Sequence, residues 1–413
     1  MSGCGCEGVH DTLMGYDAAV ARLLAAAQPL QQYERLPLEA ALGRILAVPV
    51  VSRIDVPGWD NSAMDGYALR AGDVANSETA LPVSQRIAAG FAGVPLVPHT
   101  AARIFTGAPV PEGADTVVMQ EDCLVDGSHL YVAKLPKIGA NIRRRGEDID
   151  AGDLILPAGT QLLPQHLGLA ASVGVAELTV YRRLKVALLA SGDELVMPGQ
   201  PLGAGQIYNS NQFTAAGLLQ SLGCEVVTFG MVADTLEATK AALQQAAQHV
   251  DLVLASGGVS VGEEDHVKPA VEQLGRLDMW KVAIRPGKPL AFGYIGDTPF
   301  FGTPGNPVSL FVTFLLFVRP YMRKMQGHLQ HLPHPLQAIA AFDWPKASSR
   351  REFARAQLLL NAEGDSEVHI HASRSSAVLS STVWANGLVI IPEESSPQRG
   401  DRVQFLHFDE LLK

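Results

Sequence analysis

The chain has 413 residues, which is too long for one hydrophobic core, so two to four domains are expected. Hydrophobic residues make up 47% and charged residues 18%, as in ordinary globular proteins. The net charge of −10 argues against proteins that bind nucleic acid or a membrane surface non-specifically, because both kinds of binding need a basic surface. An anionic ligand would therefore need a local positive patch.

Segments that could target the chain to a membrane or for secretion are not predicted. The longest apolar stretch, residues 308–318, is too short to span a bilayer and is expected to form a core helix. The first residues, MSGCGCEGVHD, lack the basic and apolar regions of a secretory signal. Four cysteines imply no disulfide framework, which favours a cytoplasmic protein, and Cys4, Cys6 and His10 do not complete a zinc site.

Within the first 160 residues, the sequence pattern changes from one typical of helices to one typical of β-strands. Apolar residues at helical spacing predict a helix over residues 12–28, and a second helical segment is expected at 36–46. From about residue 50 to 160, short β-like runs broken by Pro and Gly predict a mostly β lobe. Within it, the sequence VDGS at 125–128 predicts a hairpin turn.

Three polar clusters lie in the predicted β lobe. Residues 57–67 are rich in Asp, Asn, Ser and Gly, which alone indicates an Asx-type turn. Residues 104–109 end a strand at Thr106, a position that is usually structural. Residues 143–148 hold three consecutive arginines, which suit recognition of phosphate or carboxylate but could also pair with the neighbouring acids.

From residue 184 the chain alternates between strands and helices. This β–α–β order predicts a parallel sheet with helices on both faces. Asp234 followed by Glu237 predicts a capping box at the second helix. The expected strands are 186–190, 225–230, 252–255, 278–284 and 290–295, and the expected helices are 212–222, 235–248 and 266–274.

Polar segments follow the predicted strands at 191–194, at Asp234 and at 256–265. In such sheets ligands bind beyond the carboxyl ends of the strands, so these segments should meet at one edge. Residues 256–258, Ser-Gly-Gly, could form a nest for an anion, and the acids at 263–265 would then need a divalent cation between them. The alternative is a plain connection in which Asp265 caps the next helix.

Two further loops are expected at the same edge, and a β domain should follow them. Residues 281–289 place three cations among prolines and glycine, and in residues 302–307 Asn306 suits a helix N-cap with Pro307 in the first turn. Unpaired N–H groups at that helix start would face the site. Residues 336–413 predict a small β domain without evident chemistry, after a linker at 327–335 whose three histidines are expected to be exposed.

Taken together, seven ordered motifs resemble the molybdopterin molybdenumtransferase family. The resemblance covers nearly the whole chain apart from its first 11 residues, and it is looser in the C-terminal domain. The motifs are PGWDNSAMDGYA, IFTGAPVPEGAD, NIRRRGEDI, SGDEL, SGGVSVGEED, IRPGKP and GTPGNP.

The resemblance implies an enzyme that converts adenylylated molybdopterin and molybdate into molybdenum cofactor and AMP, assisted by Mg²⁺. It implies a homodimer whose active cleft lies between the α/β domain of one subunit and the β lobe of the other. The upstream adenylyltransferase is expected as a further partner, and nucleic acid and membrane are not. The implied domains are an N-terminal helix at 12–32, a linker domain at 33–51 plus 153–183, a β lobe at 52–152, a three-layer α/β molybdopterin-binding domain at 184–326 and a β domain at 336–413.

Site residues are carried over motif by motif from this resemblance. Ser191 stands where Thr is common, and Arg285 stands where some members have Lys, so hydroxyl and charge are kept. The expected catalytic residues are Asp65, Thr106, Asp234, Asp265, Lys281 and Lys288, and Glu194 and Asp265 are the expected Mg²⁺ ligands. Substrate binding is expected at Arg143, Ser191, Gly192, Asp193, Ser256, Gly257, Gly258, Ser260, Gly262, Arg285, Pro304, Gly305, Asn306 and Pro307.

Two alternative functions stay open at the level of the sequence. The chain could be the adenylyltransferase of the preceding step, which shares the central sheet but lacks the β lobe and the C-terminal domain. It could also be a peptide-binding scaffold similar to the receptor-clustering domain of gephyrin, although no second enzyme domain is fused to it.

Overall fold

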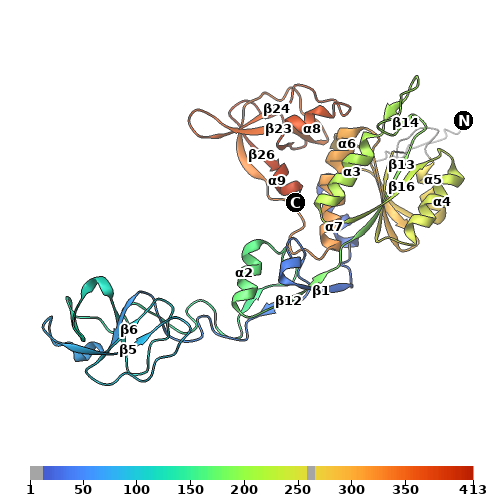
Figure 1. The fold of residues 1–413 in the computed structure, drawn as a ribbon. Helices are drawn as coiled ribbons and strands as arrows, with labels where there is room; N and C mark the ends of the chain where they lie inside the picture. Colours follow the sequence, from blue (N-terminus) through green and yellow to red (C-terminus); the bar gives the residue numbers. More distant parts are fainter. Residues whose placement is uncertain (1–12, 258–265, 413) are drawn as a thin grey trace, which may run out of the picture. The chain divides into compact units, whose positions relative to one another are not determined.

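The computed structural model describes residues 13–257 and 266–412, which form two compact units (Figure 1). Unit 1 comprises Met1–Glu34, Gly43–Ala47 and Val180–Lys413, and unit 2 comprises Arg35–Leu42 and Val48–Thr179. Within the described residues, none of the helices combines the length and apolar character that a membrane span requires.

Unit 1 is organised around a six-stranded sheet in the order β16-β13-β17-β21-β20-β18. The strand expected at 252–255 forms β17, and every one of its side chains is buried. The bounds of the strands are β13 Lys185–Ser191, β16 Glu225–Val232, β17 Leu252–Ser256, β18 Gly275–Lys281, β20 Pro289–Ile295 and β21 Thr298–Thr303.

Helices cover both faces of this sheet, so the predicted three-layer α/β domain is confirmed (Figure 1). One core packs α1, α3, α6 and α7 against the sheet, and the other packs α4 and α5 against its opposite face. The expected core helix is one continuous helical run in which α6, a π-helical segment at Phe314–Val318 and α7 follow one another. The bounds are α1 Tyr16–Ala26, α3 Ser210–Ser221, α4 Leu236–Ala247, α5 Val267–Leu274, α6 Pro307–Thr313 and α7 Arg319–Met325.

The sheet is mixed, which corrects the prediction of an all-parallel sheet. β16, β13, β17 and β21 are parallel, whereas β20 pairs antiparallel with both β21 and β18. The cause is a two-residue turn at 296–297, Gly-Asp, which joins β20 directly to β21 as a hairpin. A connection of two residues permits only an antiparallel pair.

The C-terminal part of unit 1 is a small closed barrel. β23 pairs with both β24 and β25, and β24, β22, β26 and β25 complete the ring. The short strand β19, Ile284–Arg285, pairs in parallel with β23 and so ties the 281–289 loop to the barrel. The bounds are β22 Leu336–Ala340, β23 Arg351–Leu360, β24 Ser366–Ile370, α8 Ser380–Trp384, β25 Gly387–Ile391, β26 Arg402–His407 and α9 Phe408–Leu411.

Unit 2 contains the predicted β lobe, a six-stranded sheet in the order β7-β4-β6-β5-β9-β8 with a small core on each face. The predicted hairpin at 125–128 is confirmed, because β8 and β9 pair around it. The bounds are β4 Gly66–Leu69, β5 Leu81–Ile87, β6 Ala101–Ile104, β7 Thr116–Met119, β8 Cys123–Asp126 and β9 His129–Val132. Outside the sheet lie β2 Val50–Val51, β3 Asn61–Ser62, β10 Ile142–Arg143, β11 Leu154–Leu156 and α2 Pro164–Ser172.

Three local predictions were wrong. Residues 36–46 do not form a helix: the strand β1, Tyr33–Pro37, leads into a single 3-10 turn, and Gly43 then turns the chain at a φ of 75°. Helix α4 is capped by Thr235, whose hydroxyl accepts from the Ala238 N–H, and not by Asp234. In the 327–335 linker, His328 is buried, and burial together with nearby arginines lowers its pKa to about 3, so the imidazole is neutral.

Candidate active site

The carboxyl ends of three parallel strands of unit 1 place Ser191, Ser256 and Thr303 side by side. In the register of the sheet, Ala190 pairs with Ser256, and Ser256 pairs with Thr303. On the other side of β13, Ser191 pairs with Val232, two residues before Asp234. Ser191, Ser256 and the segment that leads to Asp234 therefore lie at one edge, as predicted for the described part of these segments.

The 281–289 loop reaches the same edge. Lys281 at the end of β18 pairs with Pro289 at the start of β20, and Ala291 pairs with Gly302 near the end of β21. Since β20 runs antiparallel to its neighbours, its first residue lies where β21 ends. The three cations of this loop are thereby carried to the edge that holds Ser256.

Gly257 fits closely between neighbouring strand ends. Its N–H donates to the carbonyl of Thr303 at 3.2 Å, and its φ of +87° lies in the left-handed region. A Cβ at this position would lie 2.9 Å from the Ser191 carbonyl oxygen, so only glycine fits without displacing backbone. The first residue pair of the predicted anion nest, Ser256 and Gly257, is thus held rigidly. Gly258, Ser260, Gly262 and Asp265 lie outside the described residues.

In the turn after β13, the carboxylate of Glu194 folds back onto the backbone of Gly192. The Leu195 N–H donates to the Gly192 carbonyl at 3.1 Å. A Cβ at Gly192 would lie 2.6 Å from Oε2 of Glu194, so that carboxylate rests against the glycine. Both Asp193 and Glu194 are exposed, which leaves their carboxylate oxygens open to a ligand.

The start of α6 differs from its prediction. Asn306 occupies the N-cap position, but its side chain accepts no capping hydrogen bond. Pro307 has no N–H, and the Val308 N–H donates to the carbonyl of Ser376 at 3.1 Å. The expected set of unpaired N–H groups is therefore reduced, because the C-terminal barrel takes one of them. The Gly305 carbonyl, just before the helix, accepts from Nδ2 of Asn211 at 2.7 Å.

A loop of the C-terminal barrel, residues 373–376, is a part of this region that the sequence did not reveal. Arg355, which is 3% exposed, donates to the carbonyls of Ser373 and Ser375 and to Oγ of Ser381, at 2.8, 3.0 and 3.0 Å. A buried arginine in β23 thus fixes the loop whose last residue binds the start of α6. The pattern HASRSSA marks a polar loop, but nothing in it indicates this partner.

The predicted cations differ in their surroundings. Arg285 donates to Oε1 of the buried Glu352 at 3.1 Å, so part of its charge is already neutralised. Arg350, which the sequence analysis did not single out, lies near enough that burial and the Arg285 charge lower its pKa. Lys288 is exposed and has no ion pair within the described residues.

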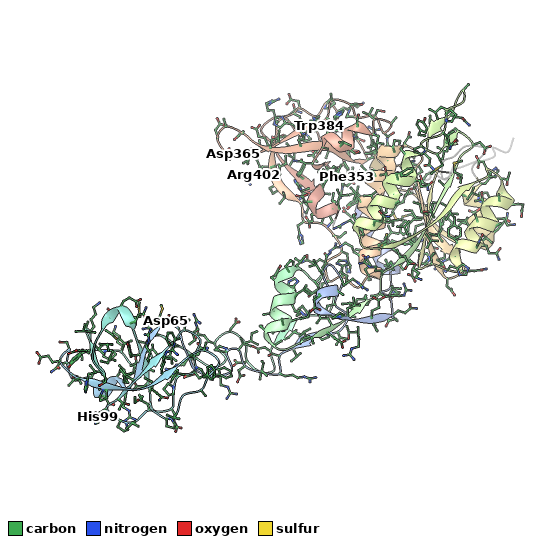
Figure 2. The ribbon with its side chains drawn as sticks, in the orientation of Figure 1. Asp65, His99, Phe353, Asp365, Trp384 and Arg402 are labelled. Carbon is green, nitrogen blue, oxygen red and sulfur yellow. The ribbon has the colours of Figure 1, made fainter. Side chains whose placement is uncertain are left out.

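In unit 2, Asp65 and Thr106 form a hydrogen-bonded pair, and Figure 2 labels Asp65. Both the N–H and the Oγ1 hydroxyl of Thr106 donate to Oδ1 of Asp65, each at 2.8 Å. These two donors, with the positive charge of Arg103, hold the pKa of Asp65 below its usual range. The carboxylate is exposed and ionised, and its other oxygen accepts none of the hydrogen bonds made within the described residues.

The three polar clusters of the β lobe meet around β3. The Ser62 N–H donates to the Ala108 carbonyl at 3.0 Å, and the Gly107 N–H donates to the Ser62 carbonyl at 2.8 Å. On the other side of β3, Arg143 pairs with Asn61 in an antiparallel ladder with β10. Three segments that lie far apart in the sequence thus carry Asp65, Thr106 and Arg143 into one region of unit 2.

The three arginines of the third cluster have different roles. Arg144 pairs with Asp60 at 2.5 Å, and Arg145 pairs with Asp55. Their guanidinium groups are therefore paired with acids of an earlier segment, whereas the neighbouring Glu147 accepts a hydrogen bond from the backbone N–H of Arg144 at 2.8 Å. Arg143 is exposed and has no ion pair within the described residues, so its guanidinium is open to an anion.

Three family models match successive parts of the chain. The chain matches the MoeA N-terminal region (domain I and II) over residues 14–174, the probable molybdopterin binding domain over 187–324 and the MoeA C-terminal region (domain IV) over 337–408. It is 42% identical over 408 residues to a molybdopterin molybdenumtransferase of Haemophilus influenzae, covering 97% of this chain and 100% of the relative. A relative of that name from Nostoc is 40% identical over 372 residues, covering 88% of this chain and 85% of the relative.

A solved structure agrees with these matches. The crystal structure of a molybdopterin biosynthesis moeA protein from Pyrococcus horikoshii superposes with a TM-score of 0.83 at 30% identity, covering 96% of this chain and 100% of that one. The agreement extends over the β lobe, the α/β domain and the C-terminal barrel alike. This chain belongs to the molybdopterin molybdenumtransferase family.

Proposed function

We propose that this protein inserts molybdenum into adenylylated molybdopterin, with molybdate as the second substrate and AMP and molybdenum cofactor as products. The observation that carries the proposal is the match along 97% of the chain to a relative named for molybdenum transfer. In addition to the central domain, the N-terminal and C-terminal regions of the chain match the family models. The minimal adenylyltransferase lacks these two regions, so the matches argue against that alternative. A peptide-binding scaffold would not need the ionised Asp65 or the ordered edge of the α/β sheet.

The edge of the sheet in unit 1 suits an anionic substrate. The turn at Ser256 and Gly257 supplies a tightly held backbone, and the 281–289 loop supplies positive charge. The substrate phosphates and molybdate are all anions, so cations and N–H donors at one place stabilise them together. Lys288 and Arg285 are both exposed, but Arg285 shares its charge with Glu352, whereas Lys288 has no ion pair within the described residues.

In unit 2, Asp65 is the group best suited to accept a proton or to orient a water. Thr106 donates two hydrogen bonds to one oxygen of Asp65 and so fixes the carboxylate and keeps it ionised. Asp234, beyond the end of β16, is the second candidate for this role. Arg143, on the same region of unit 2 as Asp65, binds the negative charge of the substrate.

The residues present fit the expected Mg²⁺. Glu194 offers an exposed carboxylate at the edge of the sheet, and Mg²⁺ is commonly held by one or two carboxylates together with substrate phosphates. No group of three or more potential ligands occurs within the described residues, so the protein alone does not form a complete cage there. When bound, Mg²⁺ supplies a Lewis acid that polarises the phosphoanhydride.

We further propose a homodimer in the cytoplasm that receives its substrate from the upstream adenylyltransferase. The family resemblance supports a cleft shared by two protomers. Mixing an Asp65→Asn variant with a Lys288→Ala variant tests this arrangement, since exchange of protomers would leave one of the two sites of each mixed dimer intact. Partial recovery of activity is expected, and a mixture as inactive as its components would count against the shared cleft.

The proposed function is tested by reconstitution. Purified protein, adenylylated molybdopterin, molybdate and Mg²⁺ are combined, and the product is used to activate a molybdenum-free molybdoenzyme. Activation that depends on all four components is expected, with Asp65→Asn strongly reduced. If the protein instead accumulates adenylylated molybdopterin from ATP and molybdopterin, the adenylyltransferase alternative replaces this proposal.

A further inference from the structure

One face of the β lobe places two arginines opposite one another on neighbouring strands. β5 and β6 run parallel, and in their register Arg86 pairs with Arg103. Like charges directly opposite each other in a sheet repel, so this arrangement is unfavourable without compensation. A negative charge or another favourable contact must therefore offset the repulsion between Arg86 and Arg103.

The ring of Phe105 provides part of that compensation. The guanidinium carbon of Arg86 lies 4.5 Å from the centroid of this ring, and that of Arg103 lies 4.7 Å from it. Both contacts are favourable cation–π interactions, and they show that the three side chains share one face of the sheet. Arg103 is fixed further by donating to the Gly66 carbonyl at 3.1 Å and to Oε1 of Gln120 at 2.6 Å.

The two arginines differ in their negative neighbours. Arg103 is close enough to Asp65 for its charge to act on that carboxylate. Arg86 is exposed, and within the described residues its guanidinium makes no hydrogen bond and no ion pair. Its guanidinium is held against Phe105 with all five N–H donors available.

The location of Arg86 connects it to the candidate active site. Phe105 directly precedes Thr106, which binds Asp65. We propose that Arg86 is a substrate-binding residue that contacts a phosphate group of the substrate, with Phe105 holding its guanidinium in place. This inference rests on the proposed function, in which the substrate carries phosphate on both its nucleotide and its pterin part.

The test compares Arg86→Gln with Arg53→Gln in the full-length protein. Arg53 is a matched control because it is an exposed arginine of the same unit with no ion pair within the described residues. Calorimetric titrations with AMP and, separately, with molybdopterin distinguish nucleotide phosphate from pterin phosphate. Loss of a charge-assisted contact should weaken binding about tenfold for Arg86→Gln, whereas Arg53→Gln should match the wild type.

The thermal midpoint of the ligand-free protein and the kinetics serve as further readouts. Arg86→Gln should leave the midpoint close to that of the wild type, because the repulsion from Arg103 and the cation–π contact with Phe105 are removed together. It should raise KM for the adenylylated substrate more than it lowers kcat. Weakening in the AMP titration assigns the contact to the nucleotide, and weakening in the molybdopterin titration assigns it to the pterin. If Arg86→Gln binds both ligands as tightly as Arg53→Gln does and the wild type is active, the role of Arg86 is refuted and the proposed function stands. A wild type that binds neither ligand would contradict the proposed function and this inference together.

Discussion

Replacing Arg355 by Met is expected to release the 373–376 loop from the start of α6. Methionine keeps much of the aliphatic stem but removes the guanidinium, which donates to two carbonyls and a hydroxyl. Hydrogen bonds from a charged donor contribute roughly 1.5–3 kcal/mol each. Burial lowers the pKa of Arg355, which shows that keeping its charge in the interior is itself unfavourable. Because the substitution also removes this unfavourable term, the free energy of unfolding is expected to fall by about 2–4 kcal/mol.

The consequence should be local as well as global. The Val308 N–H donates to Ser376, so its hydrogen exchange should speed up in Arg355→Met, and molybdenum insertion should slow. Gln357→Leu is the control, because Gln357 lies on the same strand and its side chain makes one hydrogen bond, to the Trp384 carbonyl at 2.7 Å. Urea unfolding and exchange measured by mass spectrometry report both effects. If Arg355→Met exchanged at Val308 as slowly as Gln357→Leu and inserted molybdenum equally fast, the link between barrel and site would be refuted.

Two further substitutions test the two halves of the candidate site. Thr106→Val removes one of two donors to the ionised carboxylate of Asp65, so the pKa of Asp65 should rise toward its usual range, as followed by carbon NMR against pH; a fall would contradict the assignment. Gly257→Ala forces a Cβ into a left-handed conformation 2.9 Å from the Ser191 carbonyl and should cost at least about 1–2 kcal/mol in urea unfolding. Gly305→Ala, with nothing within 4 Å, should be neutral, and equal effects of the two would contradict the packing described for Gly257.

Patterns with a strong local cause were predictable from the sequence. The apolar run of β17 and the Asp-Gly turn between β8 and β9 each depend on a few adjacent residues. The convergence at the edge of the sheet followed from the topology alone, because parallel strands must end together. The helix expected at 36–46 failed since its apolar spacing was outweighed by Pro37 and by the turn at Gly43.

Features that depend on distant partners were not predictable without the family resemblance. The antiparallel β20 follows from a two-residue turn that was not recognised as a hairpin signal. His328 is buried, although a polar residue at the start of a linker rich in proline was expected to be exposed. The pairing of Asp65 with Thr106 spans 41 residues, and the contact of Ser376 with Val308 joins separate domains, so residue types alone gave no reason to connect them.

The central claim is that this protein couples cleavage of adenylylated molybdopterin to uptake of molybdate. The most direct measurement is the amount of AMP released per protein-bound adenylylated molybdopterin when molybdate is added in the presence of Mg²⁺. One AMP for each molybdenum incorporated is predicted, with no release when molybdate is left out. AMP release that is independent of molybdate, or molybdenum incorporation without AMP, would contradict the account.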